Sequence, residues 1–278
     1  MVLRRFTASA GIAVVRNTWS GMPFQVYPGA DLSLRLGSSW KIYASANSSL
    51  RMPTFTELYY SVGGHAADKH LKPERMQAYE LGVKYLRPGI SAIASLYYHH
   101  GSDMIDWIKD LTAGEEAVWV SVNHTRLNTL GGELTVRITP GILLGRPDFF
   151  IRSFHAGYSH IHQDKDLAAN LQSAYALEYL RNKVVLQADF KIVRGLSLNV
   201  SYRWQDRVGN YEAIEAGKSL GQRSYTPYSL LDARLTWESG RWRIYAEGNN
   251  LLNVTYYDHG NIPQPGFLFR GGVSYTIR

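Results

Sequence analysis

The chain has 278 residues, with 30 Lys and Arg against 23 Asp and Glu, a formal net charge of +7 and no Cys. Without Cys it has no disulfide framework, no Cys-ligated zinc site and no thiol nucleophile. The basic residues are spread over alternate strand positions instead of forming a basic arm or helix, which argues against nucleic-acid binding.

No stretch approaches the roughly 20 apolar residues of a transmembrane helix, and residues 1–15 lack the apolar core and cleavage site of a secretory signal. The dominant pattern is instead an alternation of apolar and polar residues, which predicts β-strands. In one such run, Leu196, Leu198 and Val200 alternate with polar residues. The clearest runs are residues 30–36, 40–47, 78–85, 132–138, 184–192, 196–205, 231–238 and 242–249. We predict about twelve antiparallel strands.

The connections between these runs alternate between short and long. The short ones are residues 37–39, 87–89, 194–195 and 239–240, with a somewhat longer one at 140–147. The long, polar ones are approximately residues 17–27, 51–73, 109–116, 163–174, 208–225 and 258–265. Strict alternation places all long loops at one end of the strands and all short turns at the other, which is typical of a transmembrane β-barrel.

Aromatic residues favour the barrel over a soluble β-sandwich, whose strands also alternate. Trp40, Tyr85, Trp237, Trp242 and Tyr275 belong to the apolar face and lie near the short turns. A belt of amphipathic rings at that level is typical of a membrane interface. The opposite face carries charge on almost every strand, as expected for a water-filled lumen.

Several stretches resemble, in the same order, the C-terminal part of the TonB-dependent outer-membrane receptors, which transport iron-siderophores, haem, cobalamin and similar nutrients. They read LRMPTFTELYY (50–60), LKPERMQAYELGVKY (71–85), DMIDWI (103–108), WVSVNHTRLNTLGGELTV (119–136), NNLLNVTYYDHGNIPQPG (249–266) and GFLFRGGVSYTIR (266–278). The similarity runs from about residue 5 to the end. The matching residues are Arg51, Pro53, Thr54, Glu57, Leu71, Pro73, Glu74, Asn123, Gly132, Glu133, Asn249, Asn250, Asn253 and Tyr257, with Val273, Tyr275 and Ile277 as the C-terminal strand signal.

The resemblance implies an all-β fold, the C-terminal portion of a 22-stranded plugged barrel in the outer membrane of a Gram-negative cell. We expect residues 1–278 to be one barrel segment, with the plug domain and the N-terminal strands absent. The implied partners are outer-membrane lipid, TonB-ExbB-ExbD through the missing plug, the barrel-assembly machinery, and a metal-chelate or cobalamin-like ligand. No cofactor is implied. The family's last strand normally ends in an aromatic residue, whereas this chain ends in Arg278.

Candidate ligand contacts are aromatic or basic residues of the long loops, which stack on a bulky ligand or attract its charge. They are Tyr59, Tyr60, His65, His70, Lys72, Trp107, Trp119, Tyr211 and Tyr257. His160 and His162 share a strand face but have no third ligand, so we predict no metal site. No Ser, His and acid arrangement carries a nucleophile motif, so we predict no catalytic residue. For Arg51, Pro53, Thr54 and Glu57 we favour a structural role.

The last long connection is predicted to serve geometry before ligand contact. We expect an outgoing strand over 249–257, a loop over 258–265, and then the closing strand. Pro263 and Pro265 restrict the backbone and lower the entropy lost when the loop is ordered. Two other functions remain open at this point, a small passive outer-membrane pore and a soluble β-sandwich that binds through its loops.

Overall fold

The fold is given by a computed structural model that describes residues 5–17, 22–165, 170–173 and 179–277, so that the predicted departure at Arg278 lies outside the described residues. The strands are β1 (Phe6–Val15), β2 (Gln25–Leu36), β3 (Trp40–Arg51), β4 (His65–Ala66), β5 (Glu74–Arg87), β6 (Ile90–Asp110), β7 (Trp119–Ile138), β8 (Ile151–Lys165), β9 (Leu171–Ser173), β10 (Tyr179–Val193), β11 (Leu196–Val208), β12 (Asn210–Glu215), β13 (Lys218–Ser224), β14 (Tyr228–Ser239), β15 (Trp242–Asn249), β16 (Tyr257–His259), β17 (Ile262–Pro263) and β18 (Leu268–Tyr275). The helices are α1 (Phe55–Tyr59), the 3-10 helix η2 (Leu111–Glu116) and α2 (Pro140–Leu143).

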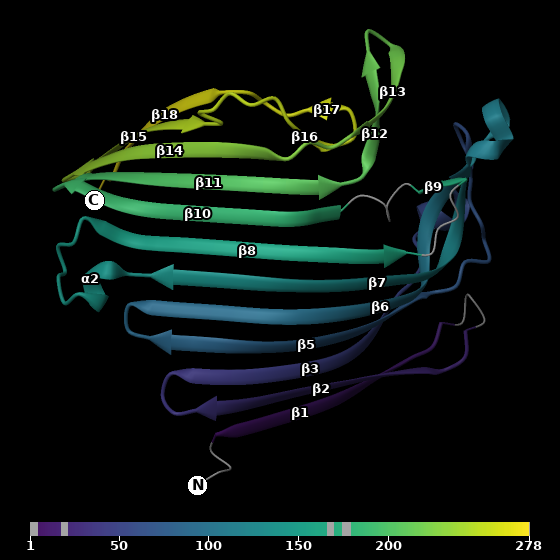
Figure 1. The fold of residues 1–278 in the computed structure, drawn as a ribbon, viewed down its shortest axis with the longest axis horizontal. Coiled ribbons are helices and arrows are strands. Elements are labelled where there is room, and N and C mark those ends of the chain that lie inside the picture. The colour runs from purple at the N-terminus through teal and green to yellow at the C-terminus, as the bar shows by residue number, and fades with distance from the viewer. Residues whose placement is uncertain (1–4, 18–21, 166–169, 174–178, 278) are drawn as a thin grey trace. The chain divides into compact units, whose positions relative to one another are not determined.

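The fold is all-β, as predicted. One sheet has the strand order β1-β2-β3-β5-β6-β7-β8-β10-β11-β14-β15-β18 (Figure 1). Strand β4 pairs with β7 and β9 pairs with β6. Neighbours in this order follow one another along the chain, and β1–β2, β2–β3, β8–β10, β10–β11, β11–β14, β14–β15 and β15–β18 pair antiparallel. The predicted antiparallel arrangement of about twelve strands is therefore confirmed.

The chain divides into two compact units. Unit 1 comprises residues 1–83, 95–132 and 161–177, and it contains α1, β4 and β9. Unit 2 comprises residues 84–94, 133–160 and 178–278, and it contains α2 and the C-terminal strands. Within unit 2, the tight turns after β10 and β14 lie at the same end as α2 (Figure 1). Within the described residues, no helix is long and apolar enough to cross a membrane.

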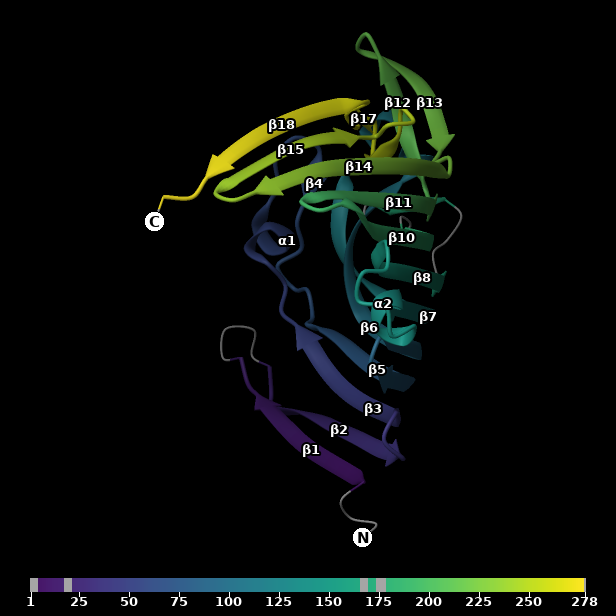
Figure 2. The same ribbon diagram turned by 90° about the vertical axis from the view of Figure 1, so that its left-hand side faces the viewer.

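The predicted loops 208–225 and 258–265 both contain short strands, so they are more ordered than the sequence suggested. The predicted loop 208–225 contains the hairpin β12–β13, which stands away from β11 and β14 in both views (Figures 1 and 2). Its turn is formed by Ala216 and Gly217, with φ of 49° and 78°. Two successive residues with positive φ are the geometry that a two-residue hairpin turn requires.

The predicted strand over 249–257 is wrong. Strand β15 ends at Asn249, and the chain then turns through Asn250 and Asn253, whose φ values are 47° and 48°. Asn tolerates this left-handed conformation better than most residues, so an Asn-rich segment stops the strand. Tyr257 instead begins β16, which pairs with β17 inside the last loop.

Large apolar side chains lie exposed in rows across the C-terminal strands. Trp237 faces Ile244 across β14–β15, and Ile244 faces Val273 across β15–β18. Their exposed fractions are 41%, 44% and 64%. By contrast, the one cluster of buried apolar residues in the described part of the chain consists of Leu58, Leu71 and Ile105. Apolar side chains thus cover one face of the strands instead of filling an interior.

On the polar face, three tyrosine rings lie directly over glycines of the next strand. A Cβ atom added at Gly82, Gly131 or Gly272 would overlap the ring of Tyr43, Tyr97 or Tyr245 respectively. Tyr43 also donates a hydrogen bond of 2.7 Å to Glu80 Oε1. A ring that covers a strand glycine replaces the missing side-chain packing and fixes the register of the two strands.

We expect Gly82→Ala to destabilise the chain by roughly 1–3 kcal/mol, because the new methyl group overlaps the Tyr43 ring. Unfolding in urea, followed by circular dichroism, measures this change. Gly11→Ala is the matched control, since nothing lies within 4 Å of a Cβ added at Gly11 in β1. In a Tyr43→Ala background the cost of Gly82→Ala should largely disappear; an undiminished cost would contradict the ring contact.

Candidate functional site

The first long loop begins with a capped helix. Thr54 is the N-cap of α1, and its Oγ1 accepts a hydrogen bond of 3.2 Å from the backbone N–H of Glu57. The Glu57 carboxylate in turn accepts from the backbone N–H of Thr54 at 2.7 Å. This reciprocal capping box satisfies two N–H groups that the helix cannot pair itself. It explains why Thr and Glu stand three residues apart.

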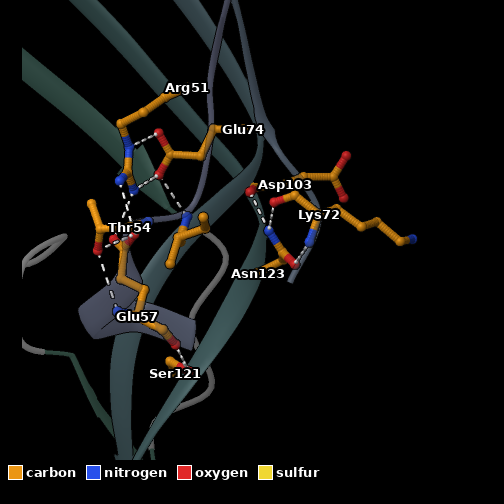
Figure 3. Close-up of polar contacts among 9 residues, drawn as sticks. Arg51, Thr54, Glu57, Lys72, Glu74, Asp103, Ser121 and Asn123 are labelled. Carbon is orange, nitrogen blue, oxygen red and sulfur yellow. Dashed lines mark hydrogen bonds and ion pairs between the residues drawn. The ribbon is translucent and has the colours of Figure 1, made fainter. Parts of the chain in front are cut away.

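Arg51, the last residue of β3, joins this helix to β5. Its Nη1 and Nη2 each donate to Glu57 at 3.0 Å, and its Nε and Nη2 each donate to Glu74 at 2.6 Å (Figure 3). We call Arg51, Thr54, Glu57 and Glu74 the arginine clamp. A guanidinium suits this position because its planar fork binds two carboxylates bidentately.

The arginine clamp also reaches β6 at Ile105, a member of the small apolar cluster. Glu74 Oε1 accepts the backbone N–H of Ile105 at 2.8 Å. Leu58 and Leu71 are 3% and 6% exposed and form the cluster with Ile105. The loop is therefore held at both ends. Arg51 holds α1 shortly after the end of β3, and Leu71 packs in the apolar cluster shortly before the start of β5.

The charge state of Glu57 follows from these contacts. Burial alone raises the pKa of Glu57, but the hydrogen bonds from Arg51 and Thr54 outweigh burial and hold that pKa below its ordinary value. The carboxylate therefore stays ionised at neutral pH, and the clamp is formed there.

A serine on β7 supports the same loop from the far side of α1. Ser121 is fully buried and donates to the carbonyl of Glu57 at 2.8 Å (Figure 3). It also accepts from the backbone N–H of Asp68 at 2.7 Å. Sequence reasoning missed Ser121, because a lone Ser in an alternating run carries no motif.

Asn123 fastens the end of the loop to two strands. Its Nδ2 donates to the carbonyls of Lys72 and Asp103 at 2.9 and 2.7 Å, and its Oδ1 accepts from the backbone N–H of Lys72 at 2.8 Å (Figure 3). A side-chain amide offers both donors and acceptor, so it pairs with an irregular segment as a neighbouring strand does. Asp103 has a φ of 54°, which marks the irregular point in β6.

Asn250 and Asn253 form a comparable clamp in unit 2. Asn250 is 4% exposed; its Nδ2 donates to the carbonyls of Val254 and Pro265 at 2.8 and 3.2 Å. Asn253 Oδ1 accepts from the backbone N–H of Phe267 at 3.0 Å. Both ends of the last loop are thereby held together just before β18. The predicted role of Pro263 and Pro265 in restricting the backbone of this loop stays a prediction.

The other motif residues lie on strands or in the same loops. Asn249 Oδ1 accepts from Arg270 at 3.1 Å, which links β15 to β18. A Cβ at Gly132 would lie 3.0 Å from Leu96, so the glycine allows close packing on β6. Glu133 is exposed on β7, Pro53 and Pro73 are half-buried in the first long loop, and Val273, Tyr275 and Ile277 are exposed at the C-terminal end.

Four of the candidate ligand contacts lie together in unit 1. The Tyr60 ring meets His65 edge-on at 5.3 Å, and His65 meets Trp107 edge-on at 5.2 Å. Trp119 faces His65 across the β4–β7 pairing. Tyr60 is 44% exposed, whereas Trp107 is 4% exposed. We call these four residues the first aromatic cluster; its accessible edge is Tyr60 and His65, supported by the Trp107 ring.

Tyr211 and Tyr257 meet in unit 2. Their rings stack at 5.2 Å, and Tyr225, which the sequence did not single out, lies 5.1 Å from Tyr211. Tyr225 also accepts a hydrogen bond from the backbone N–H of Gly260 at 2.8 Å. We call Tyr211, Tyr225 and Tyr257 the second aromatic cluster; it joins the β12–β13 hairpin to the last loop.

The remaining candidates are more isolated. Tyr59 stacks on Phe55 at 6.0 Å, the side chain of Lys72 is exposed, and exposed His70 pairs with Asp68 at 3.1 Å. His160 Nδ1 lies 2.8 Å from Asn182 Oδ1. In the described part of the chain, no group of three or more His, Asp or Glu side chains is arranged to hold a metal ion.

We expect Arg51→Lys to release the first long loop, because one ammonium cannot serve both carboxylates bidentately. A loss of about 1–2 kcal/mol would speed chymotrypsin cleavage at Phe55, Tyr59 or Tyr60 by about 5–30-fold. Arg223→Lys, on the exposed strand β13, is the charge-matched control. Equal cleavage of Arg51→Lys and the control would show that the clamp does not hold the loop.

The lowered pKa of Glu57 predicts a pH dependence. A depressed carboxylate pKa stabilises the fold above the pKa of the unfolded chain, about 4.3, and this stabilisation is lost as pH falls through the folded pKa. Glu57→Gln should therefore cost stability in urea unfolding at pH 7, and the cost should shrink below about pH 4.3. Glu215→Gln, on the exposed hairpin, should cost little at either pH. A cost for Glu57→Gln that does not change with pH would contradict the ion pair.

Comparison with known structures supports the fold. The siderophore receptor PirA from Acinetobacter baumannii has a TM-score of 0.70 at 13% identity, covering 98% of this chain and 43% of that one. The FrpB iron transporter from Neisseria meningitidis (F3-3 variant) has a TM-score of 0.66 at 18% identity, with 91% and 39% covered. The copper transporter OprC has a TM-score of 0.67 at 16% identity, with 92% and 40% covered. This chain thus spans about two fifths of each.

No curated protein matches the chain. The proteins compared above are named as receptors or transporters. The model of the family "TonB dependent receptor-like, beta-barrel" matches residues 4–251, which is most of the chain. The soluble β-sandwich is thereby set aside. The chain belongs to the family of TonB-dependent receptor β-barrels.

Proposed function

We propose that this chain is the C-terminal part of the barrel wall of an outer-membrane transporter that takes up a metal chelate. The observation that carries the proposal is the rows of exposed apolar side chains on β14, β15 and β18, in a chain of this family. Contiguous apolar surface of this kind marks contact with a membrane or another apolar partner.

In this proposal the chain supplies wall, lumen charge and external loops. The plug domain and the N-terminal strands belong to the remainder of the transporter, and the plug is the part that TonB-ExbB-ExbD would pull on. The barrel-assembly machinery would read the C-terminal strand through Val273, Tyr275 and Ile277. The coverage of about two fifths of each solved structure supports this division.

The ligand is proposed as a metal chelate on two grounds. The compared structures are named as transporters of iron or copper or as a siderophore receptor. The first aromatic cluster offers an exposed Tyr60 ring backed by His65 and buried Trp107, and aromatic faces of this kind stack on flat ligand groups. Haem and cobalamin are the competing ligands.

Lipid contact is tested by fluorescence quenching with brominated phospholipids after reconstitution of the chain. Trp242, at the short-turn end of β15, is 49% exposed and should be quenched, whereas Trp107 is 4% exposed and should not. The quenched fraction of the emission should therefore fall in Trp242→Phe. It should rise in Trp107→Phe, because that change removes only unquenched emission. A chain that stays monomeric in water without detergent and shows no quenching would contradict the membrane location.

Ligand choice is tested by titrating the reconstituted chain with a ferric catecholate, a ferric hydroxamate, haem and cobalamin. We expect saturable binding of one ferric chelate, weakened about tenfold or more in Tyr60→Ala by loss of one stacking face, worth roughly 1.4 kcal/mol. Tyr79→Ala, on β5 away from the loops, is the control. Binding of cobalamin alone, or of no compound, would contradict the proposal.

A further inference from the structure

The connection between β7 and β8 covers a cavity that no motif accounts for. It has a volume of about 640 Å³ and lies within unit 2. Its apolar lining includes Ile142 of α2, Pro147, Phe149 and Ile151, and its cations are Arg152 and Lys191. The volume falls within the range of small-molecule sites, roughly 300–1,000 Å³. The tight turns after β10 and β14 form no comparable cover, because they have only two residues each.

A second cavity of about 380 Å³ shares Arg152 with the first. It lies on the polar faces of β8, β10, β11 and β14 and is lined by Arg152, Arg234, Ser197, Asn199, Thr236, Asp189 and Leu198. Two guanidiniums beside hydroxyl and amide donors form an environment that favours an oxyanion. Arg152 is thus the point where an apolar space meets a cationic one.

The ion pairs of the described residues do not neutralise every cation that lines the two cavities. Lys191 Nζ is 2.5 Å from Asp148 Oδ1, so that ammonium is neutralised. Glu247 holds Arg270 at 2.6 Å and reaches Arg234 only at 3.5 Å. Among the described residues, Arg152 has no hydrogen-bond or ion-pair partner.

Among the described residues that line the second cavity, Asp189 is the one carboxylate, and its oxygens already have donors. Oδ2 accepts from Ser153 Oγ at 2.5 Å, and Oδ1 accepts from Asn199 Nδ2 at 2.7 Å. The lining of this cavity therefore carries two guanidiniums against one carboxylate, an excess of one positive charge. A ligand with a single negative charge balances it.

We propose that the two cavities together bind an amphiphilic monoanion, a carboxylate on an apolar tail. The carboxylate contacts Arg152 and Arg234, and the tail lies in the first cavity between Ile142 and Phe149. Such a site is separate from both aromatic clusters in sequence and in its lining residues, and it does not depend on the transported ligand. Apolar tail burial adds affinity with each methylene, and charge pairing fixes the orientation.

The test is a titration of the full chain, held in an uncharged amphipol, with acetate, butyrate, hexanoate and octanoate. Each added methylene that enters the apolar cavity should raise affinity on the order of threefold, with one octanoate bound per chain. Octanamide, which has the same tail without the charge, should bind at least tenfold more weakly than octanoate. Equal affinities for acetate and octanoate, or for octanamide and octanoate, would overturn the proposal.

Two variants locate the site. Arg152→Gln should weaken octanoate binding about tenfold or more, whereas Lys218→Gln, the same charge change on the exposed hairpin, should leave it unchanged. Ile142→Ser should flatten the dependence on tail length without removing acetate binding. Arg152 and Ile142 are both exposed, so neither change removes buried packing. Equal octanoate binding by Arg152→Gln and Lys218→Gln would place the anion elsewhere and contradict the assignment.

Discussion

The pairing of one guanidinium with two carboxylates determines how the first long loop meets the wall. Arg51 ends β3, Glu57 lies in α1 and Glu74 begins β5, so the clamp ties two strands and a helix at the point where regular pairing stops. A long polar loop has little apolar surface to bury, and its ordering entropy must be offset by other contacts. Here charge-assisted hydrogen bonds supply these contacts. Further along the loop, the side chains of Ser121 and Asn123 donate hydrogen bonds to its backbone carbonyls.

The sequence predicted the wall better than the loops. Period-two alternation and turn spacing located the long strands, because each strand has one apolar and one polar face. The resemblance pointed to Arg51, Glu57 and Asn123, whose side chains the structure places in clamps. The hairpin β12–β13 was missed because Ala216 at a positive φ carries no turn signal. Strand 249–257 failed because the local preference of Asn250 and Asn253 for left-handed backbone overrides alternation.

The polar clamps and the aromatic clusters also differ in how far the sequence predicts them. The clamps use short, defined distances between strand ends and loop backbone, and that geometry needs particular residue types. The aromatic clusters are held by ring packing, to which Tyr225 contributes although no sequence motif includes it. Ser121 and Tyr225 lie at contacts between segments distant in sequence, which a single sequence without paired changes does not reveal. The aromatic clusters, which we propose as ligand contacts, therefore lie in the part of the chain that sequence patterns describe least.

The central claim is that polar clamps, more than apolar packing, hold the long loops to the wall. Hydrogen exchange of the reconstituted chain, read by mass spectrometry, tests it most directly. We predict that amides of the clamped segments 54–58 and 250–254 exchange much more slowly than those of the exposed hairpin strand β13, and that Arg51→Lys speeds exchange in 54–58 alone. Equal exchange in clamped and unclamped segments would contradict the account.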